Sequence, residues 1–502
     1  MMNDWLHEAA TADADAAWLL CDRHDPDAVA FRVVAADLSI RSLSYGELAD
    51  RSRRLATVLR SAGVEAGHRV AVLMGKRLEL PVALLAIWRL GAIHVPLFTA
   101  FAPDAISARL TASGVRLAIS EPGQAAKLEG VAVVSVNDEL DARIRAAEPL
   151  RDRRPIGGGG QLVELYTSGT TGAPKAVPVP VRALAAFRSY LHYGLDVTED
   201  DVYWNAADPG WAYGLYYAIL GPLAHGRANL LVEGGFDPRR TLEVMNRCGV
   251  TNFAGAPTMY RALRGVGTAR LRRASSAGEP LTPDVTAWAP DALGTEVRDH
   301  YGQTEQGMVI LNGWHASVRS VVESGSMGRP LPGFTATVLD GQIALDVEAS
   351  PLMWFEGYVD APERTRERFT ADGRYYLTGD TGRVDENGAF YFTARDDDVI
   401  LAAGYRIGPF DVESVLVTHP AVADVAVVGA PDELRGEIVV AYVVLADGES
   451  PGPTFLAQLQ DLVRTRYSAH AYPRQVHVVE SLPKTASGKI QRFVLRRGTR
   501  SA

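Results

Sequence analysis

The chain has 502 residues, of which 47% are hydrophobic and 22% charged, so it can form more than one domain with a large core. Its formal net charge of −9 argues against a general nucleic-acid-binding or anionic-membrane-binding surface. The two cysteines, Cys21 and Cys248, lack the spacing of a zinc site or a disulfide framework, and a reducing compartment fits them.

The amino-terminal segment is rich in alanine but is unlike a secretory signal peptide. Asp13 and Asp15 interrupt it, and no basic residues lead it. The best apolar run, residues 81–90, is too short to span a bilayer and contains Arg89. We therefore expect a cytoplasmic protein with no membrane span and no nucleic-acid partner.

Apolar runs with strand character alternate with helical stretches through the first three quarters of the chain. Residues 69–74 predict a strand and residues 80–90 a helix. The pair recurs as a strand at 228–232 and a helix at 238–248. This alternation predicts layered α/β structure with largely parallel sheets.

A glycine- and hydroxyl-rich loop follows a strand-like stretch at residues 162–166. Its sequence is Thr167-Ser168-Gly169-Thr170-Thr171-Gly172-Ala173-Pro174-Lys175. Glycines let backbone N–H groups turn toward an anion, hydroxyls donate further hydrogen bonds, and the lysine adds a point charge. The run lacks the Gly-Lys-Ser/Thr ending of the Walker loop. It indicates a polyphosphate-binding loop, although the loop alone would also suit an exposed turn.

The pattern changes in the later part of the chain. Around residues 325–340, Gly/Pro turns and β-branched residues predict a small β subdomain. Beyond Arg395 we expect a separate α+β domain of about 100 residues. Its expected elements are helices at 411–418 and 454–467 and strands at 422–428 and 438–445.

Lysine is rare in this chain. Of 51 Lys plus Arg residues, only five are lysine: Lys76, Lys127, Lys175, Lys484 and Lys489. One of them ends the glycine-rich loop, and two lie in the segment 482–490 near the carboxyl end. A compact ammonium suits phosphate and a reacting carboxylate, so these three lysines are candidate functional groups.

Four further segments join the loop and the terminal lysine segment. They are residues 275–280 (SSAGEP), 299–305 (DHYGQTE), 375–380 (YYLTGD) and 395–409, which begins RDDDVI. In this order, and over about residues 44–492, the chain resembles the adenylate-forming superfamily of acyl-CoA synthetases, peptide-synthetase adenylation domains and luciferases. Within the superfamily its motifs are most similar to those of acetyl- and medium-chain acyl-CoA synthetases.

The resemblance implies a large α/β amino-terminal domain, residues 1–396, that includes the β subdomain and binds ATP and the acid. It also implies a small α+β carboxyl-terminal domain, residues 397–502, that carries the catalytic lysine. Asp397 matches the hinge between the two domains.

The resemblance also assigns the nucleotide site. Asp380 would hold the ribose hydroxyls with support from Arg395. The adenine would lie between residues 278–280 and Tyr301, with its amino group near Asp299. The full expected ATP-binding set is Thr167, Ser168, Gly169, Thr170, Thr171, Gly172, Lys175, Gly278, Glu279, Pro280, Asp299, Tyr301, Gly302, Gln303, Asp380, Arg395 and Arg406.

The expected catalytic groups are Lys489, Thr304 and Glu305. A carboxylate and the α-phosphate of ATP repel each other, so a cation must stabilise the charge that develops between them, and Lys489 matches that role. Thr304 would donate to the α-phosphate, and the Glu305 carboxylate would hold Mg²⁺, which prefers oxygen ligands. After adenylation the small domain would rotate, and CoA would then meet Gly404 and Arg464.

The expected acyl pocket consists of Trp211, Ala212, Tyr213, Ala277 and Gly302. Three of these are small, which predicts room beyond acetate, and each buried CH₂ would add about 0.8 kcal/mol. Tyr213 would either shorten the pocket or hydrogen-bond a functionalised or aromatic acid. No acidic residue lies between 211 and 222, which disfavours an amino-acid substrate because its buried ammonium would be unpaired.

The expected function is a carboxylic acid:CoA ligase that uses ATP and Mg²⁺, forms an acyl-AMP, and acts on a medium-chain or aryl acid. One alternative is an enzyme that loads the acid onto the phosphopantetheine of an acyl carrier protein. Another, of a different class, is a catalytically silent nucleotide-binding regulatory protein. A monomer and a homodimer both remain open.

Overall fold

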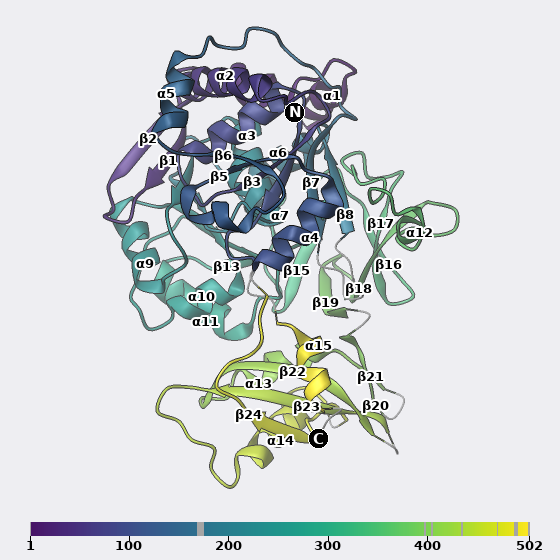
Figure 1. Ribbon diagram of the computed structural model, residues 1–502. Coiled ribbons are helices and arrows are strands. Elements are labelled where there is room, and N and C mark those ends of the chain that lie inside the picture. Colours follow the sequence, from purple (N-terminus) through teal and green to yellow (C-terminus); the bar gives the residue numbers. More distant parts are fainter. Residues whose placement is uncertain are drawn as a thin grey trace.

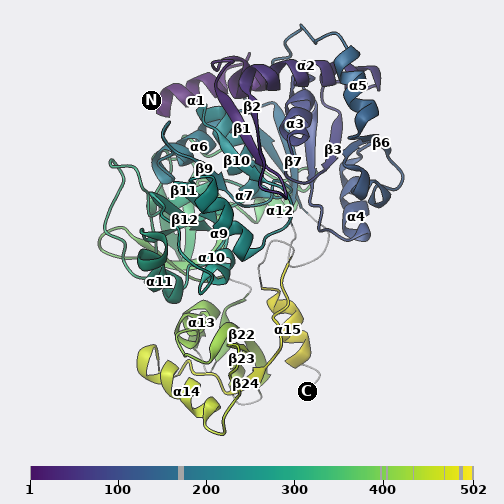
Figure 2. The ribbon, with the colours of Figure 1, turned by 90° about the vertical axis from the view of Figure 1, so that its left-hand side faces the viewer.

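The computed structural model describes residues 2–167, 175–395, 398–402, 405–432, 435–468, 470–485 and 490–499, with the side chains of 406, 498 and 499 excepted. The first four fifths of the chain form a large domain, and the remainder forms a small domain that lies at one end of it (Figure 1, Figure 2). Among the described residues, no helix combines the length and the apolarity that crossing a bilayer requires.

The first sheet of the large domain has six strands in the order β6-β5-β3-β4-β7-β8. Its parallel pairs follow from helical crossovers such as the almost wholly buried α3, so the predicted strand at 69–74 and helix at 80–90 are confirmed within a residue. The elements are β3 (Arg69–Leu73), β4 (Ile93–Leu97), β5 (Leu117–Ser120), β6 (Ala132–Ser135), β7 (Gln161–Thr167), β8 (Lys175–Pro180), α2 (Tyr45–Ser61), α3 (Glu79–Arg89), α4 (Pro103–Ser113) and α5 (Asp138–Ala146).

The second sheet has thirteen strands in the order β16-β17-β18-β19-β15-β14-β13-β12-β11-β9-β10-β1-β2. The strands from β10 to β13 pair in parallel, so their carboxyl ends meet at one edge. The strands are β1 (Val29–Val34), β2 (Ile40–Ser44), β9 (Tyr203–Asn205), β10 (Asn229–Val232), β11 (Asn252–Gly255), β12 (Arg273–Ala277), β13 (Val297–Gln303), β14 (Gly307–Leu311), β15 (Ser326–Pro330), β16 (Ala336–Leu339), β17 (Gln342–Asp346), β18 (Tyr375–Val384) and β19 (Phe390–Arg395).

The helices that accompany this sheet include an unusual one after Trp211. It begins as α7, continues as the π-helical segment η4, and ends as α8, so its middle turn is wider than an α-helical turn. The helices are α1 (Met2–Ala10), η1 (Trp18–Asp22), η2 (Pro122–Lys127), α6 (Ala183–Ser189), η3 (Tyr190–Gly194), α7 (Ala212–Gly214), η4 (Leu215–Leu220), α8 (Gly221–His225), α9 (Pro238–Arg247), α10 (Pro257–Leu263), α11 (Pro283–Leu293) and α12 (Pro362–Arg366).

The small domain is α+β with its own apolar core, as the sequence predicts. Its long hairpin of β22 and β23 extends each of the two strands that were expected there. The elements are β20 (Ile400–Ala402), β21 (Tyr405–Ile407), α13 (Pro409–Leu416), β22 (Val422–Asp432), β23 (Gly436–Leu445), α14 (Phe455–Arg466), β24 (Gln475–Val478) and α15 (Arg492–Thr499).

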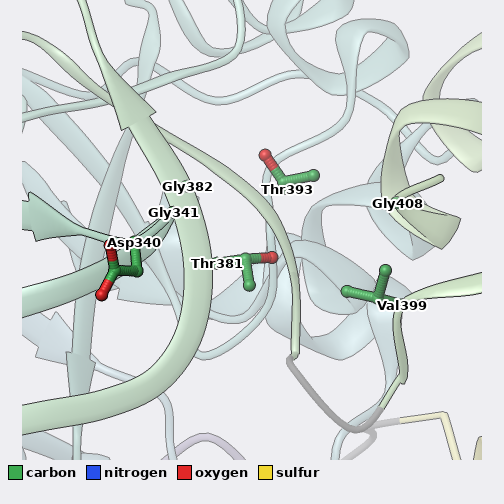
Figure 3. A pocket seen from close by; sticks show the side chains of 7 residues that line it. All are labelled: Asp340, Gly341, Thr381, Gly382, Thr393, Val399 and Gly408. Carbon is green, nitrogen blue, oxygen red and sulfur yellow. The ribbon is translucent and has the colours of Figure 1, made fainter. Parts of the chain in front are cut away.

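The two domains meet where β19 leads toward β20. The rings of Phe392 and Phe410 lie 6.2 Å apart across this junction. A cavity of about 170 Å³ lies between the two domains here, and Figure 3 shows the residues that line it. Strands β18 and β19 and a tight turn supply its large-domain wall, and Val399 and Gly408 supply its small-domain wall, the full lining being Asp340, Gly341, Thr381, Gly382, Thr393, Val399 and Gly408.

Candidate active site

Asp380 is the point on which three predicted nucleotide-site residues converge. Its carboxylate, on β18, is 5% exposed and accepts hydrogen bonds at Oδ2 from the Tyr301 hydroxyl (2.5 Å) and the Gln303 amide (2.7 Å). Arg395 lies opposite it in the β18–β19 ladder, with Nε 3.7 Å from Oδ1. The sheet thereby builds a fixed carboxylate acceptor of the kind that a pair of ribose hydroxyls requires.

Glu305 lies directly beyond β13 and is 6% exposed. Its Oε1 accepts a hydrogen bond from the Tyr358 hydroxyl (2.7 Å), and Arg368 Nε donates to that same hydroxyl (3.2 Å). Lys175 Nζ lies 5.2 Å from the centroid of the Tyr358 ring. Burial, and next the nearby Arg368 guanidinium, lower the pKa of Lys175, while the charge of Glu305 opposes them.

These contacts place the lysine that ends the glycine-rich loop beside the predicted metal ligand. Thr167 and Lys175 face each other in the β7–β8 ladder, so the two described ends of the loop are adjacent. Ser168, Gly169, Thr170, Thr171 and Gly172 lie outside the described residues. The described part therefore combines two cations, Lys175 and Arg368, with the Glu305 carboxylate, which suits a phosphate with its counterion.

The predicted adenine side is formed by the ends of β12 and β13. Gly278 has φ +99°, a backbone conformation that favours glycine, and it turns the chain toward Glu279 and Pro280. Glu279 forms an ion pair with Arg261 at 3.6 Å. Asp299 is 8% exposed and accepts from the Leu281 backbone N–H (3.2 Å).

Asp299 is an unusual carboxyl group. Its Oδ1 is buried and has no hydrogen-bond partner within the described part of the chain. Burial raises the pKa of Asp299 to about 8, against which the backbone hydrogen bonds act only weakly. A buried oxygen without a partner at this place fits an outside donor such as the adenine amino group.

The predicted acyl-pocket residues surround the start of the helix α7–η4–α8. Trp211 and Ala212 are partly exposed, whereas Tyr213 and Ala277 are buried. Tyr213 belongs to an aromatic wall with Tyr190, at 6.5 Å between ring centroids, and Tyr217, at 5.3 Å.

One reason given for an open pocket is wrong. A Cβ atom at Gly302 would lie 2.0 Å from the Gly307 carbonyl oxygen, across the β13–β14 hairpin. The glycine is therefore required by the close approach of two backbones, and its small size does not indicate space for an acyl chain. The sequence could not reveal this, because the bulge that brings the two strands together is a tertiary feature.

The small domain directs its last helix and the chain before it toward the large domain. In both views the yellow segment that precedes α15 reaches the large domain (Figure 1, Figure 2). Arg492, at the start of α15, donates from Nη2 to both carboxylate oxygens of Glu413 (2.8 Å each) and lies 3.6 Å from Asp398. Burial lowers the pKa of Arg492, but the carboxylates of Glu413, Asp398 and, in the large domain, Glu279 together raise it above its ordinary value.

The segment that bears Lys489 is held at both of its described ends. Lys484 Nζ lies 2.6 Å from Asp424, and the Gln491 backbone N–H donates to the Pro483 carbonyl (2.8 Å). Lys489, Gly404 and Asp397 lie outside the described residues, as does the side chain of Arg406 on β21.

Arg464 lies elsewhere. It belongs to α14, at the end of the small domain that is farthest from the large one (Figure 1, Figure 2). Its guanidinium lies 3.9 Å from the ring centroid of Tyr472, and Arg474 lies 4.0 Å from the same ring. This paired cation cluster is separate from the residues around Asp380.

Sequence reasoning missed Tyr358, Arg368, Tyr376 and Arg492. Tyr376 donates to Gln303 Oε1 (3.0 Å) and so fixes the amide that holds Asp380. Tyr376 lies within the 375–380 motif, but its role depends on a side-chain contact with Gln303 of β13, which is distant in the chain. Arg492 follows the terminal lysine segment. Its role is visible only in the fold, because its two hydrogen bonds to Glu413 require α13 and α15 to lie side by side.

Comparisons with known proteins agree with this arrangement. A family model described as "AMP-binding enzyme" matches residues 21–348, and one described as "AMP-binding enzyme C-terminal domain" matches residues 411–489. The acetyl-coenzyme A synthetase of Bacillus subtilis (strain 168) is 34% identical, over 97% of this chain and 91% of that protein.

Two solved structures are similar over nearly the whole chain. An acyl-CoA synthetase of Brucella canis has 42% sequence identity and a TM-score of 0.75, covering 97% of this chain and 94% of that one. A benzoate CoA ligase from Burkholderia xenovorans LB400 has 27% identity and a TM-score of 0.84, covering 96% of this chain and 99% of that one.

Proposed function

Because the chain belongs to the AMP-binding enzyme family, we propose that it is an AMP-forming ligase that joins a carboxylic acid to CoA. The observation that carries the proposal is that two groups of polar residues lie around the carboxyl end of β13. Tyr301, Gln303 and Arg395 contact the Asp380 carboxylate, and Glu305, just beyond β13, lies near Lys175 of β8.

The reaction would have two steps. An oxygen of the acid attacks the α-phosphorus of ATP, the bond between the α-phosphorus and the bridging oxygen breaks, and pyrophosphate leaves. The CoA thiolate then attacks the acyl carbon, the C–O bond to AMP breaks, and AMP leaves. Lys489 would stabilise charge in the first step, and removing such a group typically costs on the order of 10²–10³ in rate.

The residues divide these tasks. Asp380 would accept the ribose hydroxyls, and Lys175 and Thr304 would hold phosphate oxygens. The rotation expected at Asp397 would replace the Lys489 face of the small domain by a CoA-binding face. Arg464 and Arg474 would supply cations to the phosphates of CoA, which their place away from the Asp380 cluster allows.

Mg²⁺ fits the residues at Glu305. The described part of the chain holds no cluster of three or more His, Cys, Asp or Glu side chains that could bind a metal alone. Mg²⁺ commonly uses one or two carboxylates together with substrate phosphates, and Glu305 is a buried carboxylate held in place by Tyr358. When bound, the ion would neutralise part of the triphosphate charge.

The acid is proposed to be larger than acetate, of the medium-chain or aryl class. Ala212 and Ala277 are small, and the aromatic wall around Tyr213 offers apolar surface to a ring or chain. Each CH₂ buried against it would add about 0.8 kcal/mol, so neighbouring chain lengths would differ by about fourfold.

The test is ATP–pyrophosphate exchange with a panel of acids from acetate through octanoate to benzoates, followed by consumption of CoA. Exchange that is greatest with medium-chain or aryl acids, together with CoA consumption, supports the proposal. Greatest exchange with acetate contradicts the pocket. Exchange without CoA consumption, but with loading of a pantetheinylated carrier protein, would identify the carrier as acceptor, and no exchange with any acid would indicate a silent nucleotide-binding protein.

A further inference from the structure

A chain of three buried side chains fixes the direction of hydrogen bonding beside Tyr213. The Tyr213 hydroxyl lies 3.1 Å from the Tyr190 hydroxyl, which lies 2.7 Å from His300 Nδ1. At the other edge of the imidazole, Nε2 lies 3.3 Å from the Asn312 carbonyl oxygen. The exposed fractions are 4% for Tyr213, 0% for Tyr190 and 2% for His300, so water does not compete for these groups.

The backbone carbonyl decides which way every proton points. A carbonyl oxygen only accepts, so His300 Nε2 carries the hydrogen. Burial lowers the pKa of His300 to about 3, so the ring is neutral and Nδ1 is an acceptor. Tyr190 must therefore donate to Nδ1, and Tyr213 must donate to the Tyr190 oxygen. Tyr213 has then used its only proton, and its oxygen can only accept from a further group.

The position of Tyr213 makes its acceptor-only hydroxyl oxygen relevant to binding of the carboxylic acid substrate. The side chain is on the first turn of the helix that follows the partly exposed Trp211, and the charge of Asp299 acts on its hydroxyl. His300, the far member of the chain of contacts, pairs in the sheet with Ala277. The hydroxyl therefore lies between the α7 helix and the strand ends that form the proposed nucleotide site.

We propose that the Tyr213–Tyr190–His300 relay makes the acyl site selective for acids that carry a neutral hydrogen-bond donor, a hydroxyl or an aryl amine, over ethers of the same shape. The proposal rests on the proposed ligase function and specifies its substrate class. A donor on the acid completes the hydrogen bonding of Tyr213. An ether oxygen in the same place is also an acceptor, so it cannot bond to the Tyr213 oxygen. It loses its hydrogen bonds to water and gains none in return.

The test compares matched acids that differ only in the donor. Hydroxybenzoates are compared with methoxybenzoates at each ring position, and hydroxyalkanoates with methoxyalkanoates, by kcat/KM of pyrophosphate release. We expect the wild type to favour the donor acid at one position by about 10–100-fold, the cost of leaving a buried acceptor unpaired. A wild type that treats every pair alike, or favours every ether, overturns the proposal.

Three variants isolate the relay from simple pocket polarity. Tyr213→Phe removes the acceptor, so the preference should fall to about 1–3-fold. Tyr190→Phe removes the partner that holds the Tyr213 proton, so Tyr213 becomes free to donate and ether acids should improve by several-fold. Tyr203→Phe is the matched control, because its buried hydroxyl donates to the Tyr217 carbonyl outside the relay and its loss should leave the preference unchanged. A Tyr190→Phe enzyme that behaves like Tyr203→Phe contradicts the relay.

A second measurement separates this inference from the ligase assignment. Calorimetric binding of the same acid pairs to the wild-type protein needs no chemistry, and tighter binding of the donor acid supports the relay even where no pyrophosphate forms. Equal binding of donor and ether together with normal catalysis overturns the relay and leaves the ligase function standing. Melting temperatures of the three variants confirm that each is folded.

Discussion

The buried carboxyl of Asp299 predicts that nucleotide binding depends on pH. Its pKa is raised to about 8 by burial, so about one tenth of the molecules are ionised at pH 7 and about nine tenths at pH 9. Leu281 N–H occupies Oδ2, so in the neutral form the proton is on Oδ1, the oxygen that we assign to the adenine amino group. A donor would then face a donor, and only the ionised form accepts.

ATP affinity should therefore rise about tenfold between pH 7 and pH 9, and ATP binding should release a proton. The assay is calorimetric titration with ATP in buffers that differ in ionisation enthalpy. Asp299→Asn is the control that removes this titration while leaving that of ATP itself, so its affinity should follow only the titration of ATP and lack the tenfold rise. An affinity that changes equally in wild type and Asp299→Asn would refute the reasoning.

The same group makes a prediction about stability without nucleotide. Its folded pKa exceeds the ordinary value of 3.8, so between about pH 4 and pH 8 the folded state binds more protons than the unfolded state. Stability therefore falls as pH rises through that window and levels off above it. The melting temperature of Asp299→Asn should exceed that of the wild type by an amount that grows from pH 5 to pH 8, and a constant difference would contradict the buried-carboxyl account.

Three further predictions concern the site. Gly302→Ala should lose about 3 kcal/mol of stability without shifting acid preference toward acetate, because its Cβ would lie 2.0 Å from a backbone oxygen. Gly235→Ala is the control: no atom lies within 4 Å of its Cβ, so this variant should melt like the wild type. Tyr358→Phe frees the Glu305 carboxylate and should raise the Mg²⁺ concentration needed for half-maximal exchange about tenfold, and an unchanged Mg²⁺ dependence would exclude this role. Arg492→Gln should slow adenylation about 10–100-fold while thioester formation from supplied acyl-adenylate continues, whereas equal loss in both steps would indicate a purely structural residue.

Local sequence determined much of the architecture. The alternation of apolar runs predicts β3, α3, β10 and α9 within a few residues, because burial against parallel neighbours imposes the same pattern on every such element. The pattern of short strands and helices predicted beyond Arg395 indicates the small α+β domain for the same reason. Boundaries were less precise at the β22–β23 hairpin, where ladder pairing lengthens both strands beyond their apolar cores.

Contacts across the fold decided what the sequence could not. Asp380 was identifiable from its motif, but its two donors come from β13, which is distant in the chain and joins it only through the order of the sheet. Tyr358 and Arg368 carry no local signal, since their role exists only beside Glu305. The sequence by itself predicted several of the elements, the presence of a small α+β domain and the family, because these depend on local patterning and motif order. Only the tertiary structure decided the protonation of Asp299, the backbone approach at Gly302 and the polarity of Tyr213, because each depends on burial and on atoms that distant segments bring together.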